Sequence, residues 1–179
     1  MGKFLTKKKK MIYNNFMKMV EDMYKYEFKK FEELTNFELI DMLRLRSKIF
    51  VVEQNCPYLD MDGYDETGLH LLVKDLDKIV GCLRILPVGR YDEVSIGRVV
   101  VDADYRRQGI AKRMLELSIE NAVAIYGCDR IVLGAQIYAK NLYESVGFKP
   151  IDKGYLEDGI PHVHMMYTKE KDCENCNSN

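Results

Sequence analysis

The sequence lacks several features that mark specialised classes of protein. Its 179 residues include no tryptophan and only four prolines. No internal repeat and no Gly-, Ser- or Pro-rich linker divides the chain, whose length suits one domain better than two. The longest apolar runs, such as 49–52 and 99–101, are far shorter than the ~20 residues that cross a bilayer. We therefore expect a single globular domain and no membrane partner.

The beginning of the sequence also lacks the pattern of a secretory signal. The lysines at 7–10 are followed by mixed residues and not by an unbroken apolar core. The five cysteines are an odd number, and Cys56, Cys82 and Cys128 are scattered among apolar or turn residues, as buried thiols are in a reducing compartment. These features predict a cytoplasmic protein.

A metal centre is not indicated by the residue pattern. Cys173 and Cys176 form a lone Cys-x-x-Cys, but no second pair and no nearby histidine completes a zinc site. His162 and His164 share one face of a predicted strand, and two histidines without a third ligand do not make a zinc site either. We predict no metal cofactor.

Charge is distributed unevenly, although the net charge is only −1. Residues 1–30 carry nine lysines against three acidic residues, a balance of +6, so the remainder carries −7. We expect residues 1–22 to form a flexible basic arm, 23–169 the folded domain and 170–179 a disordered polar tail. The acidic body would suit an amine-bearing substrate. The basic run contains no interleaved aromatic residues, so no nucleic-acid partner is expected. For the oligomeric state, we expect a monomer or a homodimer.

Hydrophobic periodicity predicts seven strands and three helices. Strands are expected at 24–31, 69–74, 79–87, 94–101, 131–135, 148–151 and 163–168. Helices are expected from a capping box at Thr35 and Glu38 to about Gln54, and over 109–126 and 139–146. This order predicts an α/β (α+β) fold, in which a mixed central sheet of six to seven strands has helices on both faces.

The segment 55–68 is predicted to be a loop, because it holds Pro57, Gly63 and many acidic residues. Its carboxylates are those of Asp60, Asp62, Asp65 and Glu66. They could attract a cation, but ordinary solvated carboxylates are the simpler expectation for an acidic loop.

The stretch from Val99 to Ala111 carries the strongest indication of chemistry. It runs from a strand through a turn into a helix, whose first backbone amides have no intrahelical partner and bind anions such as pyrophosphate. Gly109 and Ala111 are small where the backbone would approach a ligand, and Arg106 and Arg107 add permanent positive charge. The alternative is an ordinary turn with solvated arginines.

Further residues point to a known family. Arg106-x-x-Gly109-x-Ala111 after a strand resembles the signature of the GNAT acetyltransferase superfamily, with alanine in place of the commoner last glycine. The segment 141–148, Asn-Leu-Tyr-Glu-Ser-Val-Gly-Phe, resembles its second marker. Four more segments resemble the ElaA-like subgroup of acyltransferases: 50–58, 60–63, 133–136 and 157–162. The resemblance covers residues 24–168, and the predicted strand order is also that of the family.

The resemblance implies a GNAT fold, acetyl-CoA (coenzyme A) as co-substrate, and transfer of its acetyl group to an amine. It implies cofactor contacts by Val99, Val100, Val101, Arg106, Arg107, Gln108, Gly109, Ile110, Ala111, Lys112, Asn141 and Tyr143. The strand residues would bind the pantetheine arm together with Asn141. The turn and the Arg106 side chain would bind the pyrophosphate.

Acetyl transfer requires a deprotonated amine, a polarised thioester and a proton for the departing thiolate. Tyr143 could donate that proton, or it could simply pack between helix and sheet. The base could be Glu53 or His162, with His70 and His164 as weaker candidates, and an ordered water chain could replace a dedicated base.

We therefore expect an acetyl-CoA-dependent N-acetyltransferase acting on a primary amine of a small molecule or peptide. A non-catalytic acyl-CoA-binding regulatory protein of the same fold is the alternative, and a nucleic-acid-binding module that uses the basic arm is a third hypothesis. Polyamine, aminoglycoside-like, amino-acid and protein acceptors all remain open, since one fold hosts many acceptors.

Overall fold

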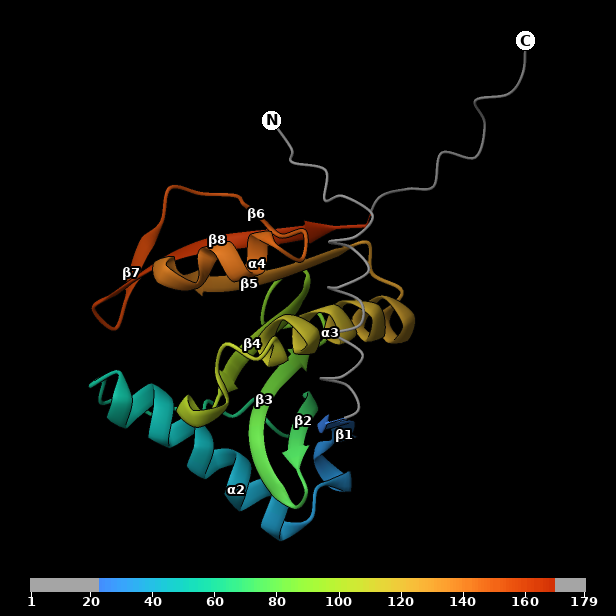
Figure 1. Ribbon diagram of the computed structural model, residues 1–179. Coiled ribbons are helices and arrows are strands. Elements are labelled where there is room, and N and C mark those ends of the chain that lie inside the picture. The colour runs from blue at the N-terminus through green and yellow to red at the C-terminus, as the bar shows by residue number, and fades with distance from the viewer. Residues whose placement is uncertain (1–22, 170–179) are drawn as a thin grey trace, which may run out of the picture.

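The computed structural model describes residues 23–169 and contains a mixed sheet of eight strands in the order β1-β2-β3-β4-β5-β8-β6, with β7 paired to β8 (Figure 1). The strands are β1 (Lys25–Lys30), β2 (Leu69–Asp75), β3 (Lys78–Leu86), β4 (Val94–Val101), β5 (Arg130–Gln136), β6 (Lys149–Pro150), β7 (Tyr155–Glu157) and β8 (Ile160–Thr168). The predicted arm, and the predicted tail with its two cysteines, lie outside the described residues.

The three predicted helices are present, and short 3₁₀ turns that the sequence did not predict accompany them. The helical segments are α2 (Asn36–Arg46), the π-helical η2 (Ser47–Glu53), α3 (Ile110–Tyr126) and α4 (Lys140–Glu144), with 3₁₀ turns η1 (Phe31–Glu33), η3 (Ala103–Tyr105) and η4 (Ile137–Ala139). Within residues 23–169 no helix combines the length and the apolar character needed to cross a bilayer. The predicted fold class is confirmed, and the three-residue β7 is a strand that the sequence pattern does not reveal.

Local sequence explains where these helices begin and end. Thr35 accepts a hydrogen bond from the amide of Glu38, whose carboxylate accepts one from the amide of Thr35, so the predicted capping box is confirmed. The helix continues from α2 into η2 and ends at Gln54. Glycines in the left-handed region flank α3, at Gly109 (φ 84°) and Gly127 (φ 61°), as a turn into and out of the helix requires.

The sheet is covered on both faces. Alternate residues of β2 point in opposite directions, so that Leu71 and Val73 join the core beneath α3 and α4, whereas Leu72 packs against α2. This two-sided burial explains why β2 and β3 read as nearly continuous apolar runs. Cys56 and Cys82 are buried free thiols, as predicted, whereas Cys128 is a free thiol that is only partly buried.

The sheet divides between β4 and β5. These parallel strands pair only at Val94–Ile131 and Ser95–Val132 in the described part of the chain. Figure 1 shows β5 and β8 turning away from β2, β3 and β4 beyond this point. A bulge lies just past the last pair, where Arg98 (φ 55°) and a neighbouring residue of β4 face one residue of β3. The strands therefore separate, and a cavity opens between them.

The acidic loop 55–68 is bound to the sheet by ion pairs, which corrects the expectation of solvated carboxylates. Arg46, only 1% exposed, contacts Asp60 and Asp65 through Nε and Nη1, both at 2.7 Å. Arg84 of β3 donates to both carboxylate oxygens of Asp62, at 2.7 and 2.8 Å, and contacts Asp65 at 2.8 Å. These contacts fix the loop over the ends of α2, β3 and β4.

The ion pairs change the protonation of the loop. Burial alone would raise the pKa of Asp62 and Asp65, but the hydrogen bonds and charges of the surrounding arginines outweigh it and hold both pKa values well below their ordinary range. A depressed pKa stabilises the fold above the ordinary carboxyl value. That stabilisation is lost as the pH falls from about 4 towards the folded pKa.

We predict that Asp65→Asn lowers the free energy of unfolding at pH 7 by roughly 3–5 kcal/mol, because two buried guanidinium groups lose a shared partner. The wild-type protein should also lose stability between about pH 4 and pH 2, and the variant should lose less over that interval. Urea denaturation at several pH values measures both effects.

The control is Asp41→Asn, which removes an exposed ion pair with Arg44 on α2 and should change stability by less than about 0.5 kcal/mol. A wild-type stability that stays constant from pH 5 to pH 2 would contradict this account of the loop.

Candidate active site

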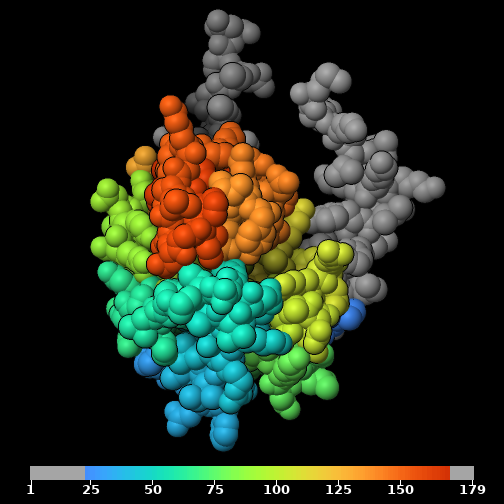
Figure 2. All heavy atoms as spheres, turned by 90° about the vertical axis from the view of Figure 1, so that its left-hand side faces the viewer, coloured from blue at the N-terminus to red at the C-terminus, as the bar shows by residue number. Residues whose placement is uncertain are grey.

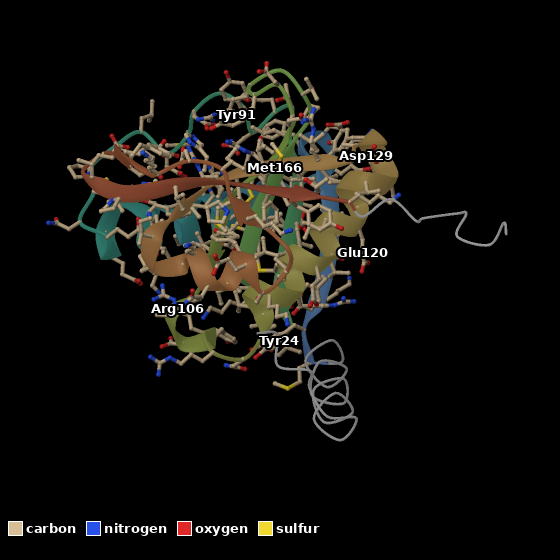
Figure 3. All side chains as sticks on the ribbon, turned by 90° about the horizontal axis from the view of Figure 1, so that it is seen from above. Tyr24, Tyr91, Arg106, Glu120, Asp129 and Met166 are labelled. Carbon is tan, nitrogen blue, oxygen red and sulfur yellow. The ribbon has the colours of Figure 1, made fainter. Side chains whose placement is uncertain are left out.

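A cavity of about 520 Å³ lies where β4 and β5 separate. It is bounded by η2 and the loop after it, by β4, by the start of α3, by η4 and α4, and by β7 and β8. Figure 2 shows the face on which the turquoise η2 region, the yellow start of α3 and the orange and red α4–β8 region come together. Arg106 and Tyr91 both line the cavity and lie on opposite sides of the molecule in Figure 3, so the cavity extends across it.

One wall of the cavity is the free edge of β4. Residues 97–101 line it, beyond the last pair with β5 at Ser95. The bulged Arg98 turns its guanidinium away to the acidic loop, where it contacts Asp60 at 2.7 Å and Asp62 at 3.0 Å. The main chain of this segment is therefore held in place, and its edge toward β5 is available to another extended chain.

The turn after β4 leads directly to the N-terminus of α3. The first intrahelical bond runs from the Arg113 amide to the Gly109 carbonyl at 3.0 Å, so the amides of residues 110–112 have no partner within the helix. Arg106 and Ala111 line the cavity. The other predicted turn residues, Arg107, Gln108, Gly109, Ile110 and Lys112, lie beyond its lining. The geometry of this turn suits an anion.

Two predicted site residues contact each other. Arg106 forms a double ion pair with Glu53 of η2, at 2.8 and 2.9 Å, and donates through Nε to the Val101 carbonyl at 3.1 Å. The hydrogen bond that Arg106 donates to Glu53 raises the pKa of Arg106 further above its ordinary value. Because its carboxylate is held by a guanidinium, Glu53 is better placed to anchor Arg106 than to accept a proton.

Tyr143 of α4 lines the cavity and is otherwise buried, with its ring edge-on to Phe148 at 6.2 Å between centroids. Burial raises its pKa well above the ordinary value, so the hydroxyl keeps its proton at neutral pH. Asn141, predicted to contact the same ligand, is exposed and lies outside the cavity lining.

His162 of β8 also lines the cavity. Its Nδ1 lies 2.8 Å from the carbonyl oxygen of Ile160, which can only accept a hydrogen bond. We therefore assign the proton of the neutral ring to Nδ1, which leaves Nε2 as an acceptor. The Glu157 carboxylate lies 3.9 Å from Nε2.

The two weaker histidine candidates do not reach the cavity lining. His70 is fully buried, with Nε2 bonded to the Asp65 carbonyl at 2.8 Å, and burial lowers its pKa. His164 pairs with Asp152 and stacks on Tyr155 at 4.2 Å between ring centroids. These contacts indicate a structural role for both histidines.

Sequence reasoning missed three residues at the cavity. Tyr155 of β7 stacks on His162, and its hydroxyl lies 2.6 Å from where a Cβ at Gly134 would stand, so that glycine makes room for it. Gln54 and Gln136 exchange amide hydrogen bonds of 3.2 and 3.0 Å between η2 and β5. Both glutamines and Gly134 lie in segments that carry the family resemblance, which is the signal that could have found them.

Several known proteins are similar to this chain in sequence and in fold. Residues 49–169 match the family model described as an acetyltransferase (GNAT) domain. The chain is 40% identical to Protein ElaA of Escherichia coli over 136 residues, which are 74% of this chain and 89% of ElaA. The crystal structure of that protein superposes with a TM-score of 0.76 and 36% identity, covering 81% of this chain and 99% of ElaA.

Two further solved structures are similar. An acyl-CoA N-acyltransferase from Pseudomonas aeruginosa has a TM-score of 0.76 and 34% identity, covering 81% of this chain and 99% of its own. An acetyltransferase from Bacillus subtilis, solved in complex with CoA, has a TM-score of 0.56 and 26% identity, covering 81% and 98%. These likenesses extend over nearly the whole of each relative.

Proposed function

The chain belongs to the GNAT acetyltransferase family, and from this premise we propose that it transfers the acetyl group of acetyl-CoA to a primary amine of a small molecule or peptide. One observation carries the proposal. A single cavity is lined by the free edge of β4, by Arg106 and Ala111 at the turn into α3, and by Tyr143 and His162. These are the groups that binding and acyl transfer require.

Acetyl-CoA suits the residues at this cavity. The amides of its pantetheine arm can pair with residues 99–101 of β4 as a further strand would. Its pyrophosphate suits the free amides at the start of α3, with Arg106 and Arg107 beside them. The Pseudomonas relative is an acyl-CoA N-acyltransferase and the Bacillus structure contains CoA, which support the same co-substrate here.

His162 is the base in this proposal. Its Nε2 accepts a proton from the acceptor ammonium, and the nearby Glu157 carboxylate stabilises the resulting imidazolium. The freed amine attacks the thioester carbonyl, which a backbone amide of β4 near Val100 or Val101 polarises. We assign this role to His162 rather than to Glu53, whose carboxylate is engaged by Arg106.

Tyr143 is the acid in this proposal. When the carbon–sulfur bond breaks, the phenol donates its proton to the departing thiolate. The nitrogen of the new amide releases its extra proton to solvent, and the phenolate regains one from solvent. Burial keeps the phenol protonated at neutral pH. The same apolar surroundings raise the proton affinity of a thiolate formed beside it, which favours the transfer. An acid and a base in one cavity support an enzyme over a non-catalytic CoA-binding protein.

We predict that acetyl-CoA raises the melting temperature of the wild-type protein and that Ala111→Glu greatly reduces this shift. The new carboxylate would stand in the cavity lining at the proposed anion site, while the residue keeps its helical conformation. Differential scanning fluorimetry measures the shift. The matched control is Ala124→Glu on the exposed side of α3, which should respond like wild type. A normal shift in Ala111→Glu would remove the start of α3 from the binding site.

We predict that Tyr143→Phe lowers kcat by ~10²-fold or more, because it keeps the ring packing and removes only the proton donor. Acetyl-CoA binding and stability should persist. Tyr138→Phe, at an exposed residue of η4, is the control and should have a mild effect. Release of free CoA thiol measures turnover. Equal kcat in wild type and Tyr143→Phe would assign this tyrosine to packing alone.

We predict that His162→Gln also lowers kcat by ~10²-fold or more while the melting-temperature shift with acetyl-CoA is retained. The glutamine side chain keeps hydrogen-bonding capacity but cannot take the proton. His164→Gln, at the residue outside the cavity lining, should retain most of the activity. Unchanged turnover in His162→Gln would transfer the role of base to Glu53 or to water.

A further inference from the structure

The end of the cavity near Tyr91 (Figure 3) is rich in guanidinium groups. Arg84, Arg90 and Arg98 line it, and all three donate hydrogen bonds to the carboxylate of Asp62. The Arg84 bonds measure 2.7 and 2.8 Å and the Arg98 bond 3.0 Å. A single carboxylate of the cavity wall therefore accepts hydrogen bonds from three guanidinium groups.

The cluster as a whole has an excess of positive charge. It joins four guanidinium groups to three carboxylates: Arg46, Arg84, Arg90 and Arg98 with Asp60, Asp62 and Asp65. Within the described residues, three of the arginines each contact two carboxylates, whereas Arg90 contacts only one carboxylate, that of Asp62. The Arg90 side chain is also the most accessible of the four, at 26%. The uncompensated charge is therefore concentrated at Arg90.

Aromatic rings hold the Arg90 guanidinium in place. Its central carbon lies 4.9 Å from the ring centroid of Tyr64 and 5.5 Å from that of Tyr91. Such contacts cover the faces of a guanidinium and leave N–H groups on its edge. The planar edge matches the two oxygens of a carboxylate, which it binds through paired hydrogen bonds.

The part of the cavity beside His162 has the opposite charge. Glu157 and Asp158 line it, and among residues 23–169 neither carboxylate forms an ion pair with a lysine or arginine. Tyr155 lines the cavity as well and stacks on His162. An ammonium group is thus favoured next to the base, and an anion at the other end.

We propose that the acceptor is a small zwitterion whose ammonium and carboxylate are several bonds apart, as the side-chain amine and the carboxylate of lysine are. The amine lies beside His162 and the carboxylate binds Arg90. This inference rests on the proposed function and narrows it to one class of acceptor. A polyamine would bring a second ammonium towards the excess guanidinium charge, which costs free energy. A simple amine would leave that charge uncompensated. The volume of about 520 Å³, part of which the pantetheine would occupy, suits a small acceptor.

The first experiment compares amines that differ only in the carboxylate: 6-aminohexanoate with pentylamine, and lysine with cadaverine. Release of CoA thiol from acetyl-CoA gives kcat/KM for each. We expect the wild-type protein to prefer the carboxylate-bearing member of at least one pair by tenfold or more, the effect of about one charged hydrogen bond. Arg90→Gln should reduce this preference to about twofold, mainly through KM. Arg44→Gln, at an exposed arginine of α2, is the control and should keep the preference.

A second measurement keeps the inference separate from the proposed function. Isothermal titration in the presence of CoA compares the corresponding products, 6-acetamidohexanoate and N-pentylacetamide, in wild type, Arg90→Gln and Arg90→Lys. We expect the wild type to bind the acid at least tenfold more tightly, Arg90→Gln to lose the difference, and Arg90→Lys to retain part of it.

The outcomes distinguish a failure of the proposed function from a failure of this inference. Turnover of none of the four amines, with the acid still preferred in binding through Arg90, would count against the proposed function and support the inference. Equal binding of the two products, binding of neither, or an undiminished preference in Arg90→Gln would overturn the inference. Turnover of the simple amines as efficiently as the amino acids would overturn it too, while leaving acetyl transfer intact.

Discussion

The cavity exists because β4 and β5 stop pairing after Ser95. Two residue pairs join these strands, whereas β5 continues along β8 for seven. The half of the sheet that contains β8 therefore turns away, and the remaining edge of β4 lines the cavity without a neighbouring strand from β5. Backbone amides at such an edge need hydrogen-bond partners. An extended ligand with its own amides is a suitable partner. The proposal that the pantetheine arm of acetyl-CoA binds here therefore depends on this gap.

Two ion-pair systems hold the walls of this gap. The Arg98 guanidinium ties the bulge of β4 to the acidic loop, and the Arg106–Glu53 pair ties the turn before α3 to η2. Both arginines line the cavity. The Arg98–Asp60 pair is largely buried, and such a pair contributes little net stability compared with apolar packing but is costly to break, so it suits a role in fixing geometry. The first system contains four guanidinium groups and only three carboxylates. The carboxylate of the proposed acceptor would compensate the remaining positive charge.

The order of the elements could be predicted because the signals are local. The capping box at Thr35 and the glycines at 109 and 127 mark the helix ends within a few residues, and apolar runs mark the central strands. β7 could not be predicted, because three residues carry no periodicity and the strand forms only by pairing with β8. The π-helical turn η2 has no sequence signal of its own either.

The motifs in the sequence indicated residues that line the cavity, among them Arg106, Ala111 and Tyr143, but contacts between distant residues were missed. The turn at 106–111 and Tyr143 could be found because the motif spacing is local. The sequence could not show that Glu53 meets Arg106, 53 positions away, so a residue that anchors an arginine was considered as the base. It also could not show that the acidic loop is neutralised by arginines from α2, β3 and β4. Both depend on how the chain folds back on itself.

Hydrogen–deuterium exchange with and without acetyl-CoA tests most directly whether the gap between β4 and β5 is the co-substrate site. The account predicts that acetyl-CoA slows exchange of the amides at 99–101 and at 110–112, and leaves the amides of β1 and β2 unchanged. Binding of acetyl-CoA with no added protection at 99–101 would contradict it, because the ligand would then lie elsewhere than along the free edge of β4.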